Sequence, residues 1–271
     1  QCSQDYTVTS YHQKPTGVPA ALQGSAIFCG RQLASAQVVA GDWHKLLPQQ
    51  AEWQLTLENF IQENRLSAVA KTVLAEDLEH GVSTLLQVAG VGSLEPNTVM
   101  IGWSDDVLRR AVFVRTVHRI LELKRNLLVF EEAENPVEGL ERRIDVWWRA
   151  KENGSLMLTL AHLIQDAPRY RDHPIRVLRI IEDEAGREQT QDAMRQLLAD
   201  ARIRAEVEIL VSSEPTMELI SRTSELSAVC FVGLSVRALA ERENPLASFT
   251  ALVAAVKGNL FITKSWHDLE L

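Results

Sequence analysis

Apolar residues recur at helical spacing after Asp77 and then run together at strand length before Ser104. The helical positions share one face and are Leu78, Val82, Leu85, Leu86 and Ala89. Asp77 can cap this helix, and Gly90 and Gly92 can end it. The apolar run at 98–102 has the length of a strand, and Ser104 can cap the helix that follows. The segment therefore predicts a helix, a strand and a second helix start, which is the pattern of an α/β crossover.

The same alternation continues along the rest of the chain. Apolar runs predict strands over residues 26–33, 67–74, 98–102, 127–130, 144–148, 175–181, 206–211, 228–234 and 260–263. Amphipathic segments predict helices over residues 50–64, 78–89, 105–124, 154–165, 184–201 and 246–257, with a further helix opened by Pro215. Strands that alternate with helices form mostly parallel sheets with helices on both faces. The sequence therefore predicts an α/β protein of mostly parallel sheet flanked by helices.

A polar segment, residues 131–143, separates two similar series of elements. Gly102 and Ser104 follow an apolar run in the first series as Gly233 and Ser235 do in the second, and in both series a helix then leads to an Asn-Leu pair. The two glycines are 233 − 102 = 131 residues apart, and the two asparagines 259 − 126 = 133. This repetition predicts two similar α/β lobes. The predicted lobes are residues 1–138 and residues 139–271.

Composition and charge exclude several classes of protein. The 28 basic and 36 acidic residues give a net charge of 28 − 36 = −8, and no dense basic block with interleaved aromatics occurs, so we expect no nucleic-acid partner. Cys2, Cys29 and Cys230 are isolated, which is typical of a reduced cytosolic protein. The apolar runs are shorter than the roughly 18 to 20 residues that span a bilayer. We therefore expect the chain, as given, to be soluble.

Motifs of catalysis and metal binding are missing from the sequence. Ser104 and Ser235 are each placed at a strand-to-helix turn, but the last glycine of a G-x-S-x-G nucleophile elbow is absent in both places. The seven histidines form no H-E-x-x-H motif and no pair four residues apart. Neither a phosphate-binding P-loop nor a G-x-G-x-x-G fingerprint occurs. We expect helix capping from the two serines, no enzymatic activity and no metal site.

One kind of ligand site stays open on the basis of fold geometry. Open α/β sheets bind ligands beyond the carboxyl ends of their strands, where helix N-termini attract anions. The candidate residues for an anion or adenine nucleotide are Gly30, Arg31, Gly102, Trp103 and Ser104, with Arg31 supplying positive charge. No cofactor is otherwise expected.

Several segments resemble the cytosolic C-terminal domain of the cation-chloride cotransporters. The most specific are the segment 90–98, GVGSLEPNT, and the segment 144–148, IDVWW, because helix or strand chemistry alone requires neither. Supporting runs are AIFCG, GSLMLTLAHLI and RIRAEVEIL, and the likeness extends from Ser25 to the C-terminus. Residues 1–24 show no clear version of the family's opening strand, so the start of the first lobe is uncertain. Trp147 and Trp148, adjacent in a strand, should point to opposite faces.

The resemblance implies regulation and assembly. In that family a bundle of transmembrane helices moves Na⁺, K⁺ and Cl⁻, while a cytosolic part with lobes similar to universal stress proteins mediates dimerisation. It implies a homodimer on the cytoplasmic side of the cell membrane, attached to its own transmembrane domain, and a prokaryotic origin is plausible. The main alternative is a stand-alone universal-stress-type nucleotide-binding protein, although its Gly-rich phosphate loop is missing. An α/β-hydrolase is disfavoured by the poor elbow.

Overall fold

The computed structural model describes residues 24–29, 33–66, 68–88, 97–103, 110–133, 141–235 and 247–266. The chain divides into two compact units, an N-terminal unit of residues 9–129 and a C-terminal unit that includes residues 130–271. The predicted division at residue 138 falls in the segment 134–140, outside the described residues.

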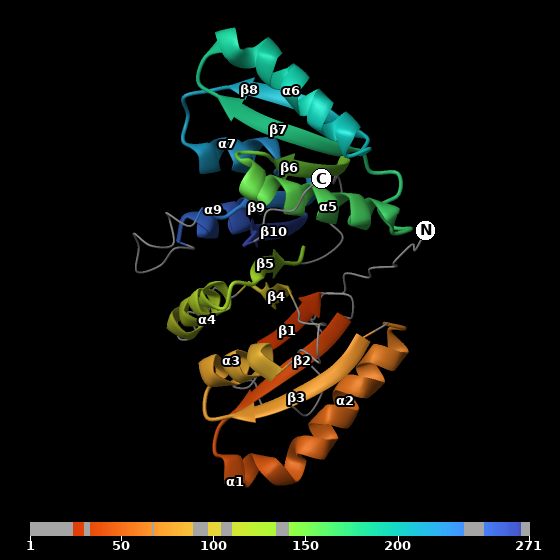
Figure 1. Ribbon diagram of the computed structural model, residues 1–271, viewed down its shortest axis with the longest axis vertical. Coiled ribbons are helices and arrows are strands. Elements are labelled where there is room, and N and C mark those ends of the chain that lie inside the picture. Colours follow the sequence, from red (N-terminus) through yellow and green to blue (C-terminus); the bar gives the residue numbers. More distant parts are fainter. Residues whose placement is uncertain are drawn as a thin grey trace. The chain divides into compact units, whose positions relative to one another are not determined.

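The C-terminal unit alternates strands with helices throughout its described part (Figure 1). Its strands are β6 (Glu141–Trp147), β7 (Ile175–Ile181), β8 (Ala205–Val211), β9 (Ser227–Gly233) and β10 (Asn259–Lys264). Its helices are α5 (Lys151–Asp166), η3 (Glu184–Gly186), α6 (Arg187–Asp200), α7 (Thr216–Thr223) and α9 (Ala247–Ala255). The strands lie in the order β10-β9-β6-β7-β8, and each neighbouring pair is parallel. This half of the predicted α/β fold is confirmed, with the bounds of β7 as predicted.

The N-terminal unit contains the first five strands. They are β1 (Gly24–Cys29), β2 (Leu33–Ala40), β3 (Ala68–Ala75), β4 (Thr98–Gly102) and β5 (Asn126–Glu131), the last of which ends inside the C-terminal unit. Its helices are α1 (Trp43–Leu46), η2 (Leu47–Gln49), α2 (Gln50–Glu63), α3 (Leu78–Val88) and α4 (Arg110–Glu122). The strand order is β3-β2-β1-β4-β5. β2 and β3 are parallel, whereas β1 is antiparallel to both β2 and β4.

The two units share one strand order. Numbered within each unit, the strands run 3-2-1-4-5 in both. Gly102 ends the fourth strand of one unit and Gly233 the fourth strand of the other, while Asn126 and Asn259 each begin a fifth strand. The pairs of residues that suggested two similar lobes therefore occupy corresponding places in the sheet.

The units differ at the connection after their first strand. In the C-terminal unit α5 joins β6 to β7, but in the N-terminal unit only residues 30–32 separate β1 from β2. A parallel pair needs a crossover of a dozen or more residues, so β2 returns antiparallel to β1. The prediction of one strand over residues 26–33 is wrong, because it merged the end of β1 with the start of β2. The small residues of β2, LASAQVVA, give only a weak strand signal.

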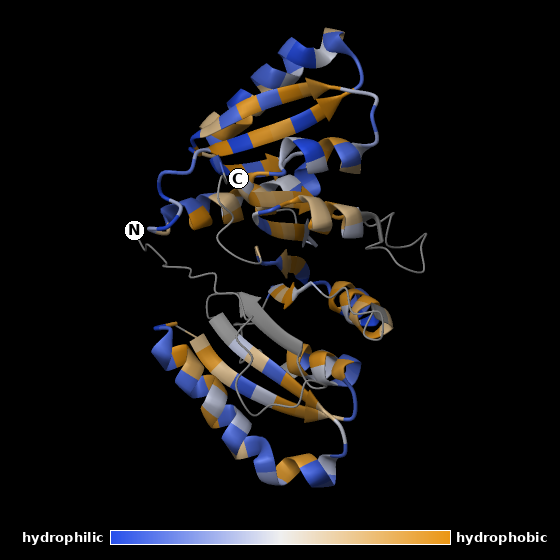
Figure 2. Ribbon diagram, turned by 180° about the vertical axis from the view of Figure 1, so that it is seen from behind, coloured by the Kyte–Doolittle hydropathy of each residue, from blue (hydrophilic) through white to orange (hydrophobic). Residues whose placement is uncertain are grey.

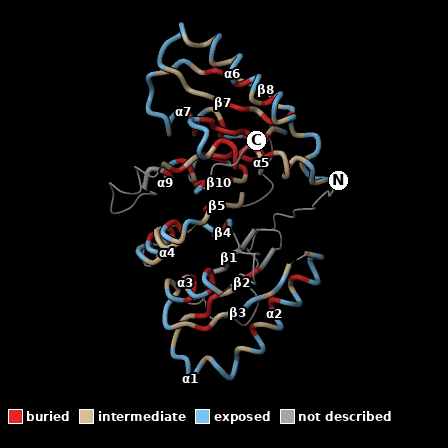
Figure 3. Tube along the Cα trace, viewed as in Figure 1, coloured by how far each residue is buried: buried red, intermediate tan, exposed pale blue. Residues whose placement is uncertain are grey.

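Each unit has its own hydrophobic core. In the N-terminal unit Val39, Trp53 and Leu74 form a buried cluster between the sheet and α2. In the C-terminal unit the rings of Phe231 and Phe261 stack on neighbouring strands with their centroids 4.8 Å apart. Figure 3 shows buried residues concentrated in the strands, and Figure 2 shows α6 as a largely hydrophilic outer helix above hydrophobic strand positions. Helices thus cover the sheets with polar surfaces turned outward.

Trp147 and Trp148 are both 5% exposed and contact different helices. The indole N–H of Trp147 donates to the hydroxyl of Ser224, at the end of α7, over 2.9 Å. The ring of Trp148 lies against Gly154 of α5, leaving no room there for a Cβ atom. The adjacent tryptophans therefore serve two separate packing contacts, one with each helix.

Candidate functional site

The end of β4 is the described part of the predicted ligand site. Apart from Gly102 itself and its two chain neighbours, no described residue has an atom within 4 Å of the place where a Cβ on Gly102 would stand. Gly102 is exposed, and Trp103 follows it directly. The other predicted site residues, Gly30, Arg31 and Ser104, lie outside the described residues. Among the described residues, nothing beyond the chain neighbours fills the space beside this strand end, and the gathering of the five residues stays a prediction.

Trp103 connects this strand end to α4. Its ring meets the ring of Phe113 edge-on, with a centroid distance of 6.0 Å and an interplanar angle of 72°. Its indole N–H is buried and has no hydrogen-bond acceptor among the described residues. A buried donor without an acceptor costs on the order of 1–3 kcal/mol. A hydrogen bond from this N–H to solvent or to a ligand would therefore be favourable.

The corresponding strand end in the C-terminal unit is filled. Asn153, in the first turn of α5, places its amide nitrogen 2.9 Å from the Cβ position of Gly233. The same amide donates to the carbonyl of Leu234 over 2.9 Å and accepts from the N–H of Ser265 over 2.9 Å. Asn153 therefore bridges the ends of β9 and β10 and occupies the space that a ligand would need. In the N-terminal unit only residues 30–32 stand between β1 and β2, and apart from its chain neighbours no described residue comes within 4 Å of the Cβ position of Gly102.

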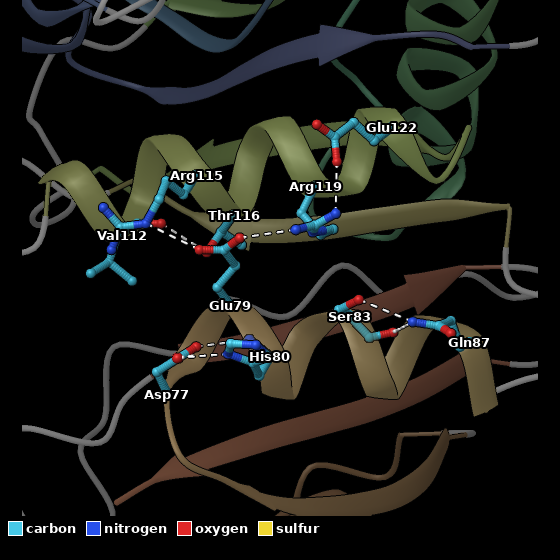
Figure 4. A network of polar contacts seen from close by, with 10 residues as sticks. All are labelled: Asp77, Glu79, His80, Ser83, Gln87, Val112, Arg115, Thr116, Arg119 and Glu122. Atoms are coloured by element: carbon cyan, nitrogen blue, oxygen red, sulfur yellow. Dashed lines mark hydrogen bonds and ion pairs between the residues drawn. The ribbon is translucent and has the colours of Figure 1, made fainter.

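A second polar feature joins α3 to α4 in the N-terminal unit (Figure 4). The carboxylate of Glu79 accepts from Nε of Arg115 and from Nη2 of Arg119, each over 3.1 Å. The other end of the Arg119 guanidinium donates to Glu122 over 2.9 Å. Because one carboxylate holds two arginines from the neighbouring helix, this network ties α3 and α4 together at the surface.

The N-terminus of α3 carries a titratable pair beside this network. The carboxylate of Asp77 accepts the backbone N–H of His80 over 2.8 Å and lies 2.7 Å from the ring Nδ1 of His80. The hydrogen bond to Asp77 raises the pKa of His80, and the bonds from His80 lower the pKa of Asp77. The sequence predicted Asp77 as a cap, but not its histidine partner, although a histidine three residues after a capping aspartate is a signal for such a pair.

Two kinds of reactive site, a cysteine nucleophile and a metal centre, can be checked in the described residues. Cys230 is fully buried, and burial together with the charge of Asp145 raises the pKa of its thiol, so it stays protonated. Among the described residues there is no group of three or more His, Cys, Asp or Glu side chains that could hold a metal ion. In the same part of the chain, no helix combines the length and apolar character needed to cross a membrane.

Comparison with known sequences gives one consistent family. Residues 32–130 match the family model of solute carrier family 12. Cation-chloride cotransporter 1 of Oryza sativa subsp. japonica is 25% identical over 193 residues, which are 67% of this chain and 19% of that protein. Cation-chloride cotransporter 1 of Arabidopsis thaliana is 24% identical over 180 residues, which are 63% of this chain and 18% of that protein. The resemblance to the cation-chloride cotransporters is confirmed. The chain spans about a fifth of the length of these two cotransporters.

Solved structures agree with the cotransporter resemblance at the level of the fold. The cytoplasmic domain of a prokaryotic cation chloride cotransporter superposes with a TM-score of 0.61 at 14% identity, covering 85% of this chain and 84% of that one. A universal stress protein from Archaeoglobus fulgidus DSM 4304 gives a TM-score of 0.55 at 14% identity, covering 83% of this chain and 80% of that one. The predicted fold class, α/β and similar to universal stress proteins, is therefore confirmed.

Proposed function

We propose that this chain is the cytosolic C-terminal part of a cation-chloride cotransporter, where it mediates pairing of two copies and regulates the symport of Na⁺, K⁺ and Cl⁻. The ions are moved by a transmembrane domain of the same longer protein. The observation that carries the proposal is the sequence similarity to plant cation-chloride cotransporters over 67% of the chain. The fold likeness to a cytoplasmic domain of such a transporter supports it.

Pairing through this chain suits a membrane-tethered parent. Two copies attached to neighbouring membrane domains meet at high effective concentration, so a weak contact suffices. Identical chains most often associate by a closed two-fold axis, and a specific contact of this kind buries roughly 1,000 Å² or more. We therefore propose a two-fold homodimer of modest affinity, located at the cytoplasmic face of the membrane.

Light scattering over a concentration series tests the pairing. The mass of one chain is 30.4 kDa, and we expect the average mass to rise toward twice that value at high micromolar concentration. A mass that stays at one chain over the whole series contradicts pairing through this domain.

The coding sequence upstream tests the larger assignment: hydrophobic segments of membrane-spanning length in frame support a transporter. Their absence supports the stand-alone nucleotide-binding alternative.

A non-enzymatic role is part of the same proposal. Cys230 is buried and protonated, and the two strand-end serines lack the glycine of a nucleophile elbow. Assays with activated esters and with nucleoside triphosphates should show no turnover above the rate of buffer. Turnover that depends on the concentration of the chain and is lost with a Ser235→Ala variant contradicts this part.

A second candidate function is binding of an anion or adenine nucleotide near Gly30, Arg31, Gly102, Trp103 and Ser104. Two observations favour it: among the described residues, nothing beyond its chain neighbours lies beside the Cβ position of Gly102, and the buried indole N–H of Trp103 has no acceptor. Calorimetry with ATP, ADP and AMP is the direct measurement. A Gly102→Ala variant puts a methyl group into the open space, whereas Gly186→Ala adds one where nothing lies within 4 Å in the other unit. We expect binding heat that Gly102→Ala weakens and Gly186→Ala preserves. Absence of heat in the unmodified chain contradicts the site.

A further inference from the structure

β3 is the outermost of the described strands of the N-terminal unit, so one row of its backbone groups has no described strand beside it. The N–H of Gly41, just after β2, donates to the carbonyl of Ala75 over 2.9 Å, which shows that Ala75 faces β2. Backbone groups of successive residues in a strand point to alternate sides. Ala70 and Thr72, which differ from Ala75 by odd numbers of residues, therefore face the free edge.

Gln54 of α2 bonds both of these edge groups. Its amide nitrogen donates to the carbonyl of Ala70 over 3.2 Å, and its amide oxygen accepts the N–H of Thr72 over 2.8 Å. The nitrogen also donates to Glu58 over 2.8 Å, which fixes the orientation of the amide because only a donor can face a carboxylate. One donor and one acceptor, bonded two residues apart on a strand, reproduce what the N–H and C=O of one residue in a parallel neighbouring strand would offer.

The C-terminal unit has a related arrangement on its own outermost strand, β8. The N–H of Ser212 donates to the carbonyl of Ile181 on β7 over 3.1 Å, so Ile209, three residues earlier, faces the free edge. The guanidinium of Arg187, the first residue of α6, donates to the carbonyl of Ile209 over 2.8 Å. In both units a side chain from the helix that precedes the edge strand thus bonds a backbone group of that edge.

We propose that Gln54 is a clasp that closes the edge of β3 against strand addition by a second copy of this chain. An exposed edge strand is a template for pairing with another chain, and β3 is a strong one. It is eight residues long, has Lys71 as its single charge, and leaves Val69 half exposed. Gln54 takes up the hydrogen bonds of Ala70 and Thr72 at the centre of β3. Any pairing of two copies then uses other surfaces, so this inference stands whether or not the chain dimerises.

Amide hydrogen exchange at Thr72 in the full 271-residue chain tests the clasp, because Gln54 is the acceptor for that N–H. Gln54→Ala should raise the exchange rate of Thr72 roughly tenfold at low protein concentration, the scale of one lost hydrogen bond. At high concentration the rate should fall again as a second copy supplies the missing acceptor, and light scattering should show association stronger than in the unmodified chain. Gln62→Ala, an exposed glutamine of the same helix, is the matched control and should change neither quantity.

Two results overturn the proposal: a Thr72 exchange rate that is the same in Gln54→Ala and in the control, or a rate that does not depend on protein concentration. If Gln54→Ala loses its folded circular-dichroism spectrum, Gln54→Met decides the matter. Methionine keeps the length of the side chain but cannot donate to Ala70 and is only a weak acceptor for Thr72, so the exchange rate of Thr72 should rise and association should increase. Unchanged association in Gln54→Met rejects the clasp.

Discussion

Asp145 and Arg176 form a two-pronged ion pair inside the C-terminal unit. Nε and Nη2 of Arg176, on β7, donate to the two carboxylate oxygens of Asp145, on β6, each over 2.9 Å. Asp145 is 0% exposed and also accepts the hydroxyl of Ser224 over 2.6 Å. Burial alone would lower the pKa of Arg176, but the bonds and charges of Asp145 and Glu208 outweigh it and raise that pKa. The pair joins two strands to the end of α7.

Removing one member of this pair should destabilise the C-terminal unit strongly. Asp145→Ala leaves the guanidinium of Arg176, whose side chain is 16% exposed, with Glu208 as its remaining carboxylate, and leaves Ser224 without its acceptor. Breaking a buried pair typically costs about 3–5 kcal/mol. We expect a loss of that order in the free energy of unfolding measured with urea. Asp192→Ala, which removes an exposed carboxylate paired with Arg195, is the control and should change stability by about 0.5 kcal/mol or less. Equal effects of the two substitutions contradict this account.

Gly154→Ala should destabilise the chain although it replaces glycine in a helix. Alanine is favoured over glycine in a helix interior by about 1 kcal/mol. A Cβ at this position, however, would lie 2.5 Å from the ring of Trp148, and overpacking of a core costs about 1–3 kcal/mol. The steric cost should exceed the gain in propensity, so we expect a lower melting temperature. Gly186→Ala, which meets nothing within 4 Å, should not lower it.

The pKa of His80 should depend on its hydrogen bond to Asp77. Because the pKa of His80 is raised above its ordinary value of 6.5, the folded state favours the charged ring. The contribution of this group to stability is therefore fully present below pH 6.5 and is lost as the pH rises through the folded pKa. An NMR titration should place the pKa of His80 above 6.5, and Asp77→Asn should bring it down toward that value. A pKa of His80 that is the same in both proteins is inconsistent with the pair.

Glu79 should couple α3 to α4 weakly and in a salt-dependent way. Its side chain is 26% exposed and faces Arg115 and Arg119, which are 55% and 40% exposed, so solvent screens both pairs. Exposed pairs contribute about 0.2–1 kcal/mol, and salt reduces them. We expect Glu79→Gln to lower the free energy of unfolding by no more than about 1 kcal/mol at low ionic strength. The loss should shrink in about 1 M salt, where the screening length is about 3 Å. A loss that is independent of salt points to packing instead.

Local chemistry was enough to predict most elements of this chain. β4 and β7 match their predicted bounds because each is an apolar run closed by polar or turn-forming residues. The repeated Gly-x-Ser and Asn-Leu patterns marked strand ends that the structure places alike in both units. Other local segments, 90–98 and 144–148, carried the resemblance to cation-chloride cotransporters. These features depend on residues close together in the sequence, so periodicity and capping signals report them directly.

The tertiary structure alone decided which of these elements meet and what fills the space between them. The antiparallel direction of β1 depends on strand pairing, which no single segment encodes. Asn153 reaches Ser265 across 112 positions of sequence, and Gln54 reaches Thr72 across 18, so neither bond leaves a periodic signal. A hydrogen bond of this kind forms only after folding has brought two distant backbones within about 3 Å. The sequence therefore predicted where the strands end. Only the folded chain showed that Asn153 fills the space beside Gly233, whereas no described residue beyond the chain neighbours does so at Gly102.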